Sequence, residues 1–358
     1  SSHYLRALTD MADRRTVVAG AAIYTDNGIK LVEKGARIDS RLYDRLVQHK
    51  LREPIDRHLS IENPVDVPAL LALGQTLIEQ ETLPAMLAEA LGSGARLLAP
   101  LRSLPLPSAM ACKLTVMRDQ RPTLFQHSLV MTTVAVFLAL KSGLSERDCS
   151  TVAAAALLHD LGVLHMDPAW DDPDHKVVGV GRKHLVAHPI SAMLMIRDTQ
   201  AYPRAAEVAV LEHHERMDGS GFPFNCNGAD IHEYARIIMI ADLYDNITTE
   251  REGYIKQTPF AAIAQLTRNM FTSLDPTVCV PVLTHIKDAF LGSRVTLNNG
   301  EKGIIAAYPN DFAAHPIISI SNDEILNLLW PDGNGTLNNL HTNIKRLRGY
   351  LSRISNYK

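Results

Sequence analysis

Apolar residues recur with a helical period through most of the segment between residues 109 and 289. Within it, Ala153–Leu158 is an unbroken run of alanine and leucine, without glycine or proline, which predicts a buried helix. His127–Leu140 and Ala235–Leu243 are two further apolar runs. The pattern breaks at Asp171–Gly181, where one proline and two glycines among polar residues predict a loop.

The N-terminal part of the chain has a different pattern. Residues 16–31 alternate loosely around Asp26-Asn27-Gly28, which is a strong signal for a β-hairpin. A helix is expected to start at Ile38-Asp39-Ser40, and Pro64–Leu98 has the spacing of two helices. We therefore predict a small α+β module over residues 1–100, which is either a regulatory or dimerising module or a structural cap.

The pattern changes again near the C-terminus. Three prolines in Pro100–Pro107 predict a linker, after which residues 101–289 are expected to form a helical domain. Arg294–Ile305 has a second hairpin pattern around an Asn-Asn-Gly turn, and Ile317–Ile320 adds a strand. Residues 290–358 are thus predicted to be a β-hairpin extension and tail with a structural role.

Composition narrows the classes of function that the chain can have. Its 358 residues suggest two or three domains, and 36 basic against 39 acidic residues give no electrostatic case for binding a nucleic-acid polymer or an acidic membrane surface. Four scattered cysteines fit a reducing compartment better than a disulfide scaffold. The apolar run Leu129–Leu140 is too short to span a bilayer. A cytoplasmic protein is expected.

The most informative stretch begins at His213-His214-Glu215 and continues into a glycine-rich turn. Adjacent histidines point in different directions, so two neighbouring metal ions, each taking one imidazole, suit them better than one ion. Gly219 and Gly221 allow backbone angles that other residues resist, and Phe222-Pro223 closes the turn. Alone, the pair could equally be a polar surface loop.

Other candidate ligands lie on or beside the apolar segments. His159-Asp160 follows the alanine and leucine run, His127 opens another run, and His188 stands between the two histidine motifs. Asp242 lies inside an apolar run, where a carboxylate is costly unless it is paired or bound, and Asp245 follows one helical turn later. Imidazole and carboxylate together suit Zn, Fe, Mn or Co, so a metal cluster is predicted.

The order of these motifs resembles an HD-GYP domain, the subgroup of HD-type metal phosphohydrolases associated with cyclic di-GMP hydrolysis. The resemblance covers roughly Leu114 to Ile286, and its most specific part is the run from His213 to Pro223. It implies a mainly α fold, in which an all-helical domain surrounds two or three metal ions, accompanied by the small α+β module and the short β-containing extension.

The resemblance also implies roles for individual residues. Asp160 is expected to bridge two ions and Asp242 to complete one coordination shell, with Asp245 beside them as a further catalytic carboxylate. Glu215 is expected to orient a metal-bound imidazole. The implied metal ligands are His127, His159, Asp160, His188, His213, His214 and Asp242. The implied substrate-binding residues are Arg251, Lys256, Gly219, Gly221, Phe222 and Pro223.

Several positions depart from the family's pattern. Val163 stands where the family has a lysine near the phosphate, and Phe222 stands where it usually has tyrosine. Thr123 and Arg121 replace acids near the third metal and the substrate. We therefore predict two divalent ions rather than three, with iron or manganese favoured and zinc, nickel or cobalt also compatible.

Three hypotheses of function follow from these residues. In the leading one, the chain is a phosphodiesterase that hydrolyses cyclic di-GMP with a water activated by two metals. In the alternative, it is a degenerate member that binds cyclic di-GMP, or a partner such as a diguanylate cyclase with a GGDEF domain, without efficient turnover. In the third, it hydrolyses a different nucleotide. A homodimer is compatible with all three.

Overall fold

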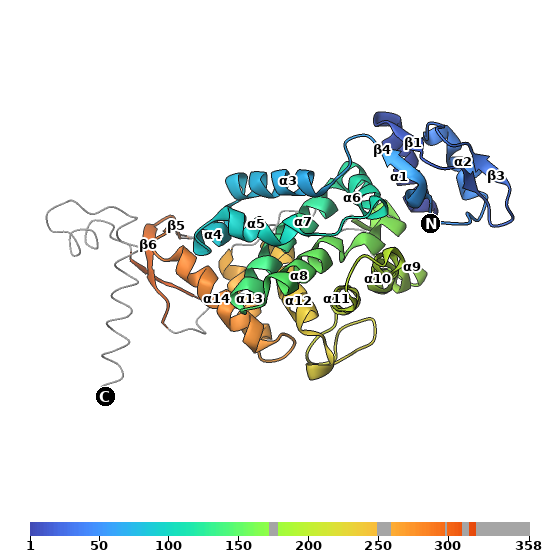
Figure 1. Ribbon diagram of the computed structural model, residues 1–358. Helices are drawn as coiled ribbons and strands as arrows, with labels where there is room; N and C mark the ends of the chain where they lie inside the picture. The colour runs from blue at the N-terminus through green and yellow to red at the C-terminus, as the bar shows by residue number, and fades with distance from the viewer. Residues whose placement is uncertain (172–177, 249–258, 298, 310–314, 320–358) are drawn as a thin grey trace.

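The computed structural model describes residues 1–171, 178–248, 259–297, 299–309 and 315–319. Helices make up most of this part of the chain, and its sheets are small, so the predicted mainly α fold class is confirmed. A small N-terminal lobe stands at one end of a larger helical body, and a short sheet lies at the opposite end (Figure 1).

The N-terminal lobe combines one long helix with short strands. Its antiparallel pairs are β1 with β4 and β2 with β3, and the second pair is the hairpin predicted around Asn27-Gly28. Gly28 has a φ of 84°, which a residue with a side chain rarely adopts. The elements are α1 (Ser2–Arg14), β1 (Val17–Ala19), β2 (Ile23–Tyr24), β3 (Lys30–Val32), η1 (Ser40–Leu42), α2 (Tyr43–Val47), η2 (Ile55–His58) and β4 (Leu59–Ile61).

Three helices follow where the pattern predicted two: α3 (Val67–Gln80), α4 (Thr82–Ala90) and α5 (Gly94–Arg102). The third exists because the Ser93 side chain accepts a hydrogen bond from the Ala95 N–H and so caps a new helix. Pro100 lies inside α5, so the proline-rich linker begins only after Arg102, later than predicted. The division of the chain at residue 100 stays a prediction.

The helical body continues from residue 108. Its elements are α6 (Ser108–Gln120), α7 (Pro122–Lys141), α8 (Glu146–Leu158), η3 (Leu161–His165), η4 (Pro168–Asp171), α9 (Val180–Val186), α10 (His188–Thr199), α11 (Arg204–Glu212), η5 (Gly228–Asp230), α12 (Glu233–Thr248), α13 (Pro259–Asn269) and α14 (Pro276–Phe290). Residues 178 and 179 of the predicted loop precede α9, whereas 172–177 lie outside the described residues.

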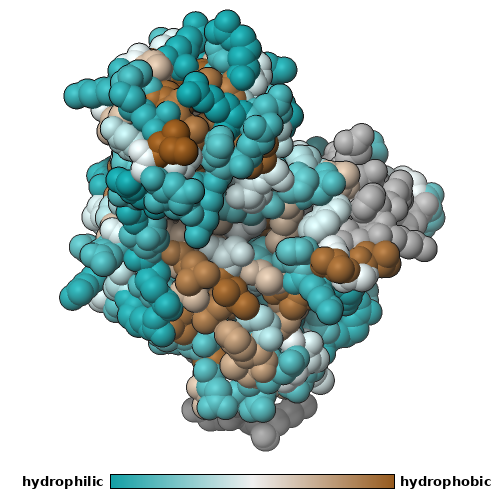
Figure 2. Space-filling model, turned by 90° about the vertical axis from the view of Figure 1, so that its right-hand side faces the viewer, coloured by the Kyte–Doolittle hydropathy of each residue, from teal (hydrophilic) through white to brown (hydrophobic). Residues whose placement is uncertain are grey.

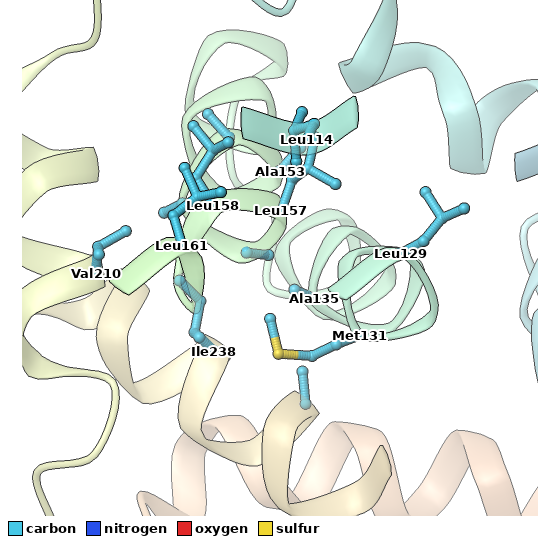
Figure 3. Packing of buried hydrophobic residues seen from close by; sticks show 14 of the residues in the cluster. Leu114, Leu129, Met131, Ala135, Ala153, Leu157, Leu158, Leu161, Val210 and Ile238 are labelled. Carbon is cyan, nitrogen blue, oxygen red and sulfur yellow. The ribbon is translucent and has the colours of Figure 1, made fainter. Parts of the chain in front are cut away.

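The core of this body is centred on α7 and α8. Figure 3 shows Met131 and Ala135 of α7 gathered with Leu157 of α8 and Ile238 of α12. Helix α7 is long and apolar enough to cross a membrane, but 78% of its most apolar stretch is buried inside the structure. Alanines on α8 leave room for neighbouring helices to approach closely, which brings their polar ends together.

The C-terminal part forms a three-stranded antiparallel sheet of β5 (Arg294–Thr296), β6 (Lys302–Ala307) and β7 (Ile317–Ser319). Strand β6 is the central one and pairs with both neighbours, which confirms the second predicted hairpin and the added strand. The predicted C-terminal tail lies outside the described residues.

Helix α10 packs directly on the turn η3, and Gly162 makes this contact possible. A Cβ at Gly162 would lie 2.2 Å from the carbonyl oxygen of His188, which is a backbone atom that cannot swing away. The missing side chain therefore sets how closely Asp160, just before η3, approaches His188, the first residue of α10.

We expect Gly162→Ala to destabilise the protein by about 1–3 kcal/mol, because overpacking forces a backbone shift. Urea unfolding measures the change, and the same variant should hold less metal. Gly94→Ala is the matched control, because the nearest atoms to its added Cβ belong to the side chains of Ile78 and Ala88 rather than to backbone, and the closest of them, at 3.2 Å, is the end of the Ile78 side chain. Equal stability of the Gly162 variant and the unaltered chain would contradict the close approach.

Candidate metal centre

Seven imidazole and carboxylate side chains from separate helices meet in one place. His127 comes from α7, His188 opens α10, and Asp242 lies in α12. The remaining four, His159, Asp160, His213 and His214, directly follow the last residues of α8 and α11. The seven form two groups that could each hold a metal ion, one of Asp160, His188, His213 and His214 and the other of His127, His159 and Asp242.

Asp160 stands between the two groups. Its Oδ1 lies 3.1 Å from Nε2 of His188 and 3.8 Å from Nε2 of His213. Its Oδ2 lies 3.3 Å from Nε2 of His159 and 4.0 Å from Nε2 of His127. Each carboxylate oxygen therefore faces a different set of imidazoles, as a bridging ligand requires.

The second group is closed by Asp242, whose Oδ1 lies 3.2 Å from Nε2 of His127. The Asn246 side-chain amide donates a hydrogen bond to the same oxygen at 2.7 Å and so fixes the carboxylate. Oδ2 of Asp242 lies 4.0 Å from Nδ1 of His214, which belongs to the first group. Asp242 thus also lies near both groups.

Three of the histidines are oriented by carbonyl groups at the ends of the helices that precede them. Nδ1 of His159 lies 2.8 Å from the Ala156 carbonyl, and Nδ1 of His188 lies 2.6 Å from the Leu185 carbonyl. His213 repeats the arrangement on the carbonyl of Val210, also at 2.6 Å. A carbonyl only accepts, so each Nδ1 carries the hydrogen, and Nε2 is the ring nitrogen left to face the centre.

This orientation leaves lone pairs facing one another. Nε2 of His188 and Nε2 of His213 are 3.3 Å apart, and two acceptors repel at that distance unless a cation or a proton lies between them. Nε2 of His159, fully buried, has no hydrogen-bond partner among the described residues. Unpaired buried polar atoms are costly, so the arrangement suits bound cations.

His127 is oriented differently, by an acid. Its Nδ1 lies 2.5 Å from Oδ2 of Asp245, one helical turn beyond Asp242 on α12. Burial opposes the charged imidazole, but the carboxylates of Asp242 and Asp245 outweigh it and raise the pKa of His127 to about 10. A carboxylate behind a metal-binding imidazole is a common second layer of a metal site, and it strengthens the ligand. Asp245 therefore touches a ligand rather than lying within either group.

His213, His214 and Asp160 are held in the forms that bind metals. Burial, together with the neighbouring imidazoles, lowers the pKa of His213 well below its ordinary value. Burial likewise lowers the pKa of His214 to about 3, so both rings are neutral. Burial opposes the charged form of Asp160, but His159 and His188 outweigh it and hold the pKa of that carboxyl well below its usual range. Neutral imidazoles and ionised carboxylates fit a divalent first-row metal.

The turn after the histidine pair is held by Glu215, which corrects the expectation that it orients an imidazole. Its side chain, fully buried, accepts hydrogen bonds from the backbone N–H groups of Phe224 at 2.7 Å and Cys226 at 3.0 Å. Gly221 allows the chain to fold back against Glu215, because a Cβ at this position would lie 2.4 Å from the Glu215 Cα. Glu215 thus shapes the turn, and within the described part of the chain its carboxylate accepts from backbone N–H groups rather than from an imidazole of the centre.

The turn covers one side of the centre. The Phe222 ring lies 4.6 Å from the His214 ring and 6.3 Å from the His188 ring, between ring centroids. Gly219 has a φ of 75°, so its backbone adopts the conformation predicted for the turn. Pro223 follows Phe222 through a cis peptide bond.

The remaining predicted residues fall into two sets. Arg251 and Lys256 lie outside the described residues. Val163 is half-buried in η3, three residues after Asp160, and offers no charge there. Thr123 is exposed at the start of α7, whereas Arg121 is buried, so no carboxylate extends the centre on this side of the described structure.

Sequence reasoning missed the groups that orient the ligands. The carbonyls of Ala156, Leu185 and Val210 leave no mark in a side-chain pattern, although each lies three residues before its histidine. Asn246 was also missed, and its spacing of four from Asp242 was the available signal.

Comparisons with known proteins agree with this geometry. A family model described as an HD domain matches residues 111–278, which include all seven residues of the centre. A 3'3'-cGAMP-specific phosphodiesterase of Vibrio cholerae is 26% identical over 237 residues, covering 64% of this chain and 51% of the relative. A cyclic di-GMP phosphodiesterase of Pseudomonas aeruginosa is 27% identical, covering 51% of this chain and 44% of the relative.

Two further similarities complete the comparison. A cyclic di-GMP phosphodiesterase response regulator of Xanthomonas campestris is 31% identical, covering 43% of this chain and 40% of the relative. The chain thus spans about half, or less, of the length of these curated relatives. A solved structure described as an HDG"Y"P protein from Bdellovibrio bacteriovorus has a TM-score of 0.41 at 17% identity, covering 76% of this chain and 93% of that one.

The family match covers the two histidine motifs and the carboxylates that the sequence placed in one cluster, and the relatives are named as phosphodiesterases of cyclic dinucleotides. The predicted resemblance is thereby confirmed, since residues 111–278 of this chain match the HD domain model.

Proposed function

We propose that the centre holds two divalent metal ions and hydrolyses a phosphodiester bond of a cyclic dinucleotide. The observation that carries the proposal is the placement of Asp160, whose two oxygens face two different sets of imidazoles. A bridging carboxylate holds two ions close enough to act on one phosphate. When bound, such ions polarise the phosphate and lower the pKa of a water between them.

The protein's own residues would prepare this chemistry. His159, His188 and His213 are fixed by backbone carbonyls, so they would bind metals without losing rotamer freedom on binding. Asp242, held by Asn246, would complete one shell. Phe222, beside His214, is placed to contact a substrate base or to exclude water where the turn covers the centre. Arg251 and Lys256 are proposed as phosphate ligands from the sequence alone.

Cyclic di-GMP is our first choice of substrate, with iron or manganese as the metal. Two of the relatives are named as cyclic di-GMP phosphodiesterases, whereas another is named for 3'3'-cGAMP. The two nucleotides share the cyclic phosphodiester backbone and differ in one base, so the metal centre itself does not separate them. We expect the turn after the histidine pair, and the residues that contact the bases, to determine which of the two nucleotides is preferred.

A second candidate function is binding of the nucleotide without efficient turnover, in which the chain acts on a partner such as a GGDEF-domain protein. Val163 favours it, because an aliphatic side chain three residues from Asp160 cannot neutralise a phosphate as the family's lysine would. In this case the metals would hold the substrate without sufficient stabilisation of the charge that develops during hydrolysis.

The first prediction concerns metal content. Protein purified without chelator and reconstituted anaerobically with iron or manganese should hold two ions per chain by elemental analysis. Asp160→Ala should lose both ions, because it faces both groups, whereas Asp242→Ala should lose mainly one. His184→Ala is the control, because that exposed histidine lies outside both groups. Equal metal content in Asp160→Ala and the unaltered protein would sink the bridging role.

The second prediction concerns Asp245 as the acid that orients His127. Asp245→Ala should weaken metal binding or turnover by roughly 10–100-fold, the usual cost of losing such a partner. Asp245→Asn should cost less, since its amide oxygen still accepts a hydrogen bond from Nδ1. Metal titration followed by an activity assay separates the two variants. Identical losses in both would mean that Asp245 acts through its charge, as a ligand or a base.

The third prediction separates turnover from binding. The metal-loaded protein should convert cyclic di-GMP to a linear product, detected by chromatography, and Asp160→Ala should not. If calorimetry shows binding and chromatography shows no product with iron or manganese, the second candidate is favoured. Val163→Lys should then raise trace turnover, because it restores a cation beside Asp160. A panel with 3'3'-cGAMP and linear nucleotides tests the remaining substrate classes.

A further inference from the structure

A cavity of about 680 Å³ lies between the N-terminal lobe and the helical body, and none of the seven residues of the metal centre lines it. The lobe contributes residues from α1, α2 and η2, and the body contributes residues from α6, η3 and α10. A volume between about 300 and 1,000 Å³ is typical of sites for small molecules. The lobe is the upper part of the molecule in Figure 2, where apolar side chains gather on it and on the body below.

Apolar side chains line part of the cavity on both sides. Leu46 and Val47 of α2 lie on the lobe side, and Ala109, Met110 and Met195 lie on the body side. Val47 is 36% exposed, which is high for a valine and leaves its side chain free for contact. An apolar wall of this extent favours a ligand with an apolar body.

A buried polar group marks the floor of the cavity. Lys113 of α6 is only 5% exposed, pairs with the carboxylate of Asp56 on η2, and lies 4.9 Å above the ring of Tyr4. The Tyr4 ring stacks on His165 with ring centroids 5.1 Å apart. Nε2 of His165 has no hydrogen-bond partner among the described residues. The floor is thus a built polar cluster joining lobe and body, with an unsatisfied nitrogen beside the cavity.

Three basic residues line the rim on the lobe side, beside Glu53, whose carboxylate lies 3.1 Å from His58. His49, Lys50 and Arg52 are consecutive or nearly so, all three line the cavity, and all are exposed. Lys50 approaches Asp26 only to 3.7 Å, and the Arg52 guanidinium stacks at 5.5 Å from the Tyr24 ring, so neither cation is held in a tight ion pair there. On the opposite rim, Arg57 is already paired with Asp198 at 2.7 Å.

We propose that this cavity binds a small amphipathic anion, with its apolar body between α2 and α6 and its anionic head at His49, Lys50 and Arg52. A carboxylate or sulfonate on an aliphatic or aromatic body has this chemistry. The acid inside, Asp56, already neutralises Lys113, so the head group is placed at the rim and not on the floor. The site does not depend on the proposed phosphodiesterase activity.

The position of the cavity would let a bound ligand influence the metal centre through the elements that it contacts. His165 is the last residue of η3, which begins directly after Asp160, and Met195 lies on α10, which begins with His188. A ligand that contacts the lobe, η3 and α10 together would stabilise their mutual packing. By linkage it would also raise the stability of the folded protein.

The test uses the full chain in its metal-loaded form. The fluorescent probe 8-anilinonaphthalene-1-sulfonate should bind with saturation and be displaced by decanoate, but much less well by the neutral decanol. Ala109→Phe and Val47→Trp fill the cavity from opposite walls, and each should weaken probe binding by about tenfold or more. The double variant Lys50→Gln and Arg52→Gln should weaken decanoate by about fivefold and leave decanol unchanged.

Ala99→Phe is the matched control, because it adds the same ring at a separate cavity lined by α5 and α8 and should leave binding intact. Circular dichroism and thermal unfolding establish that each filled variant is folded. Unchanged probe binding in both filled variants would overturn the site. Equal displacement by decanoate and decanol would overturn the anionic head group.

Discussion

The arrangement of the centre depends on helix ends that aim at one point. The last carbonyls of a helix have no partner within it, and the partial negative charge of the helix end favours cations. In α8, α9 and α11, one of these carbonyls accepts the Nδ1–H of a histidine that follows. The same hydrogen bond satisfies the helix end and turns the opposite ring nitrogen toward the metal.

Packing of the helices converts this local rule into a cluster. Alanines on α8 let α7 and α11 approach, and this close packing brings His127, His159 and His213 together. Each carbonyl orients a single imidazole ring, whereas the carboxylates make further contacts. Asp160 lies near imidazoles of both groups, and Asp245 orients His127. Without cations the result is a set of buried lone pairs, so the fold itself is better satisfied when metals are bound.

A feature could be predicted from the sequence where residue type or periodicity indicates it, and could not where it depends on contacts that only the folded chain makes. The buried helices, the two hairpins and the clustering of the seven imidazole and carboxylate side chains were predictable, since periodicity and residue type indicate them. The helix α5 was not, because a serine cap outweighed Pro100, which the helix accommodates. Glu215 was misassigned because its partners are backbone N–H groups nine and eleven residues later, which only the folded turn brings within reach.

The turn η3 links the two parts of the structure. It spans five residues, begins after Asp160 and ends at His165, whose ring stacks on Tyr4 of the N-terminal lobe. Gly162 fixes its contact with α10, so a shift at one end cannot be absorbed by a gap in the middle. Close-packed interiors transmit small displacements for this reason. Asp160 is therefore the residue of the candidate metal centre most directly connected to the N-terminal lobe, which gives the lobe a physical means to influence that centre.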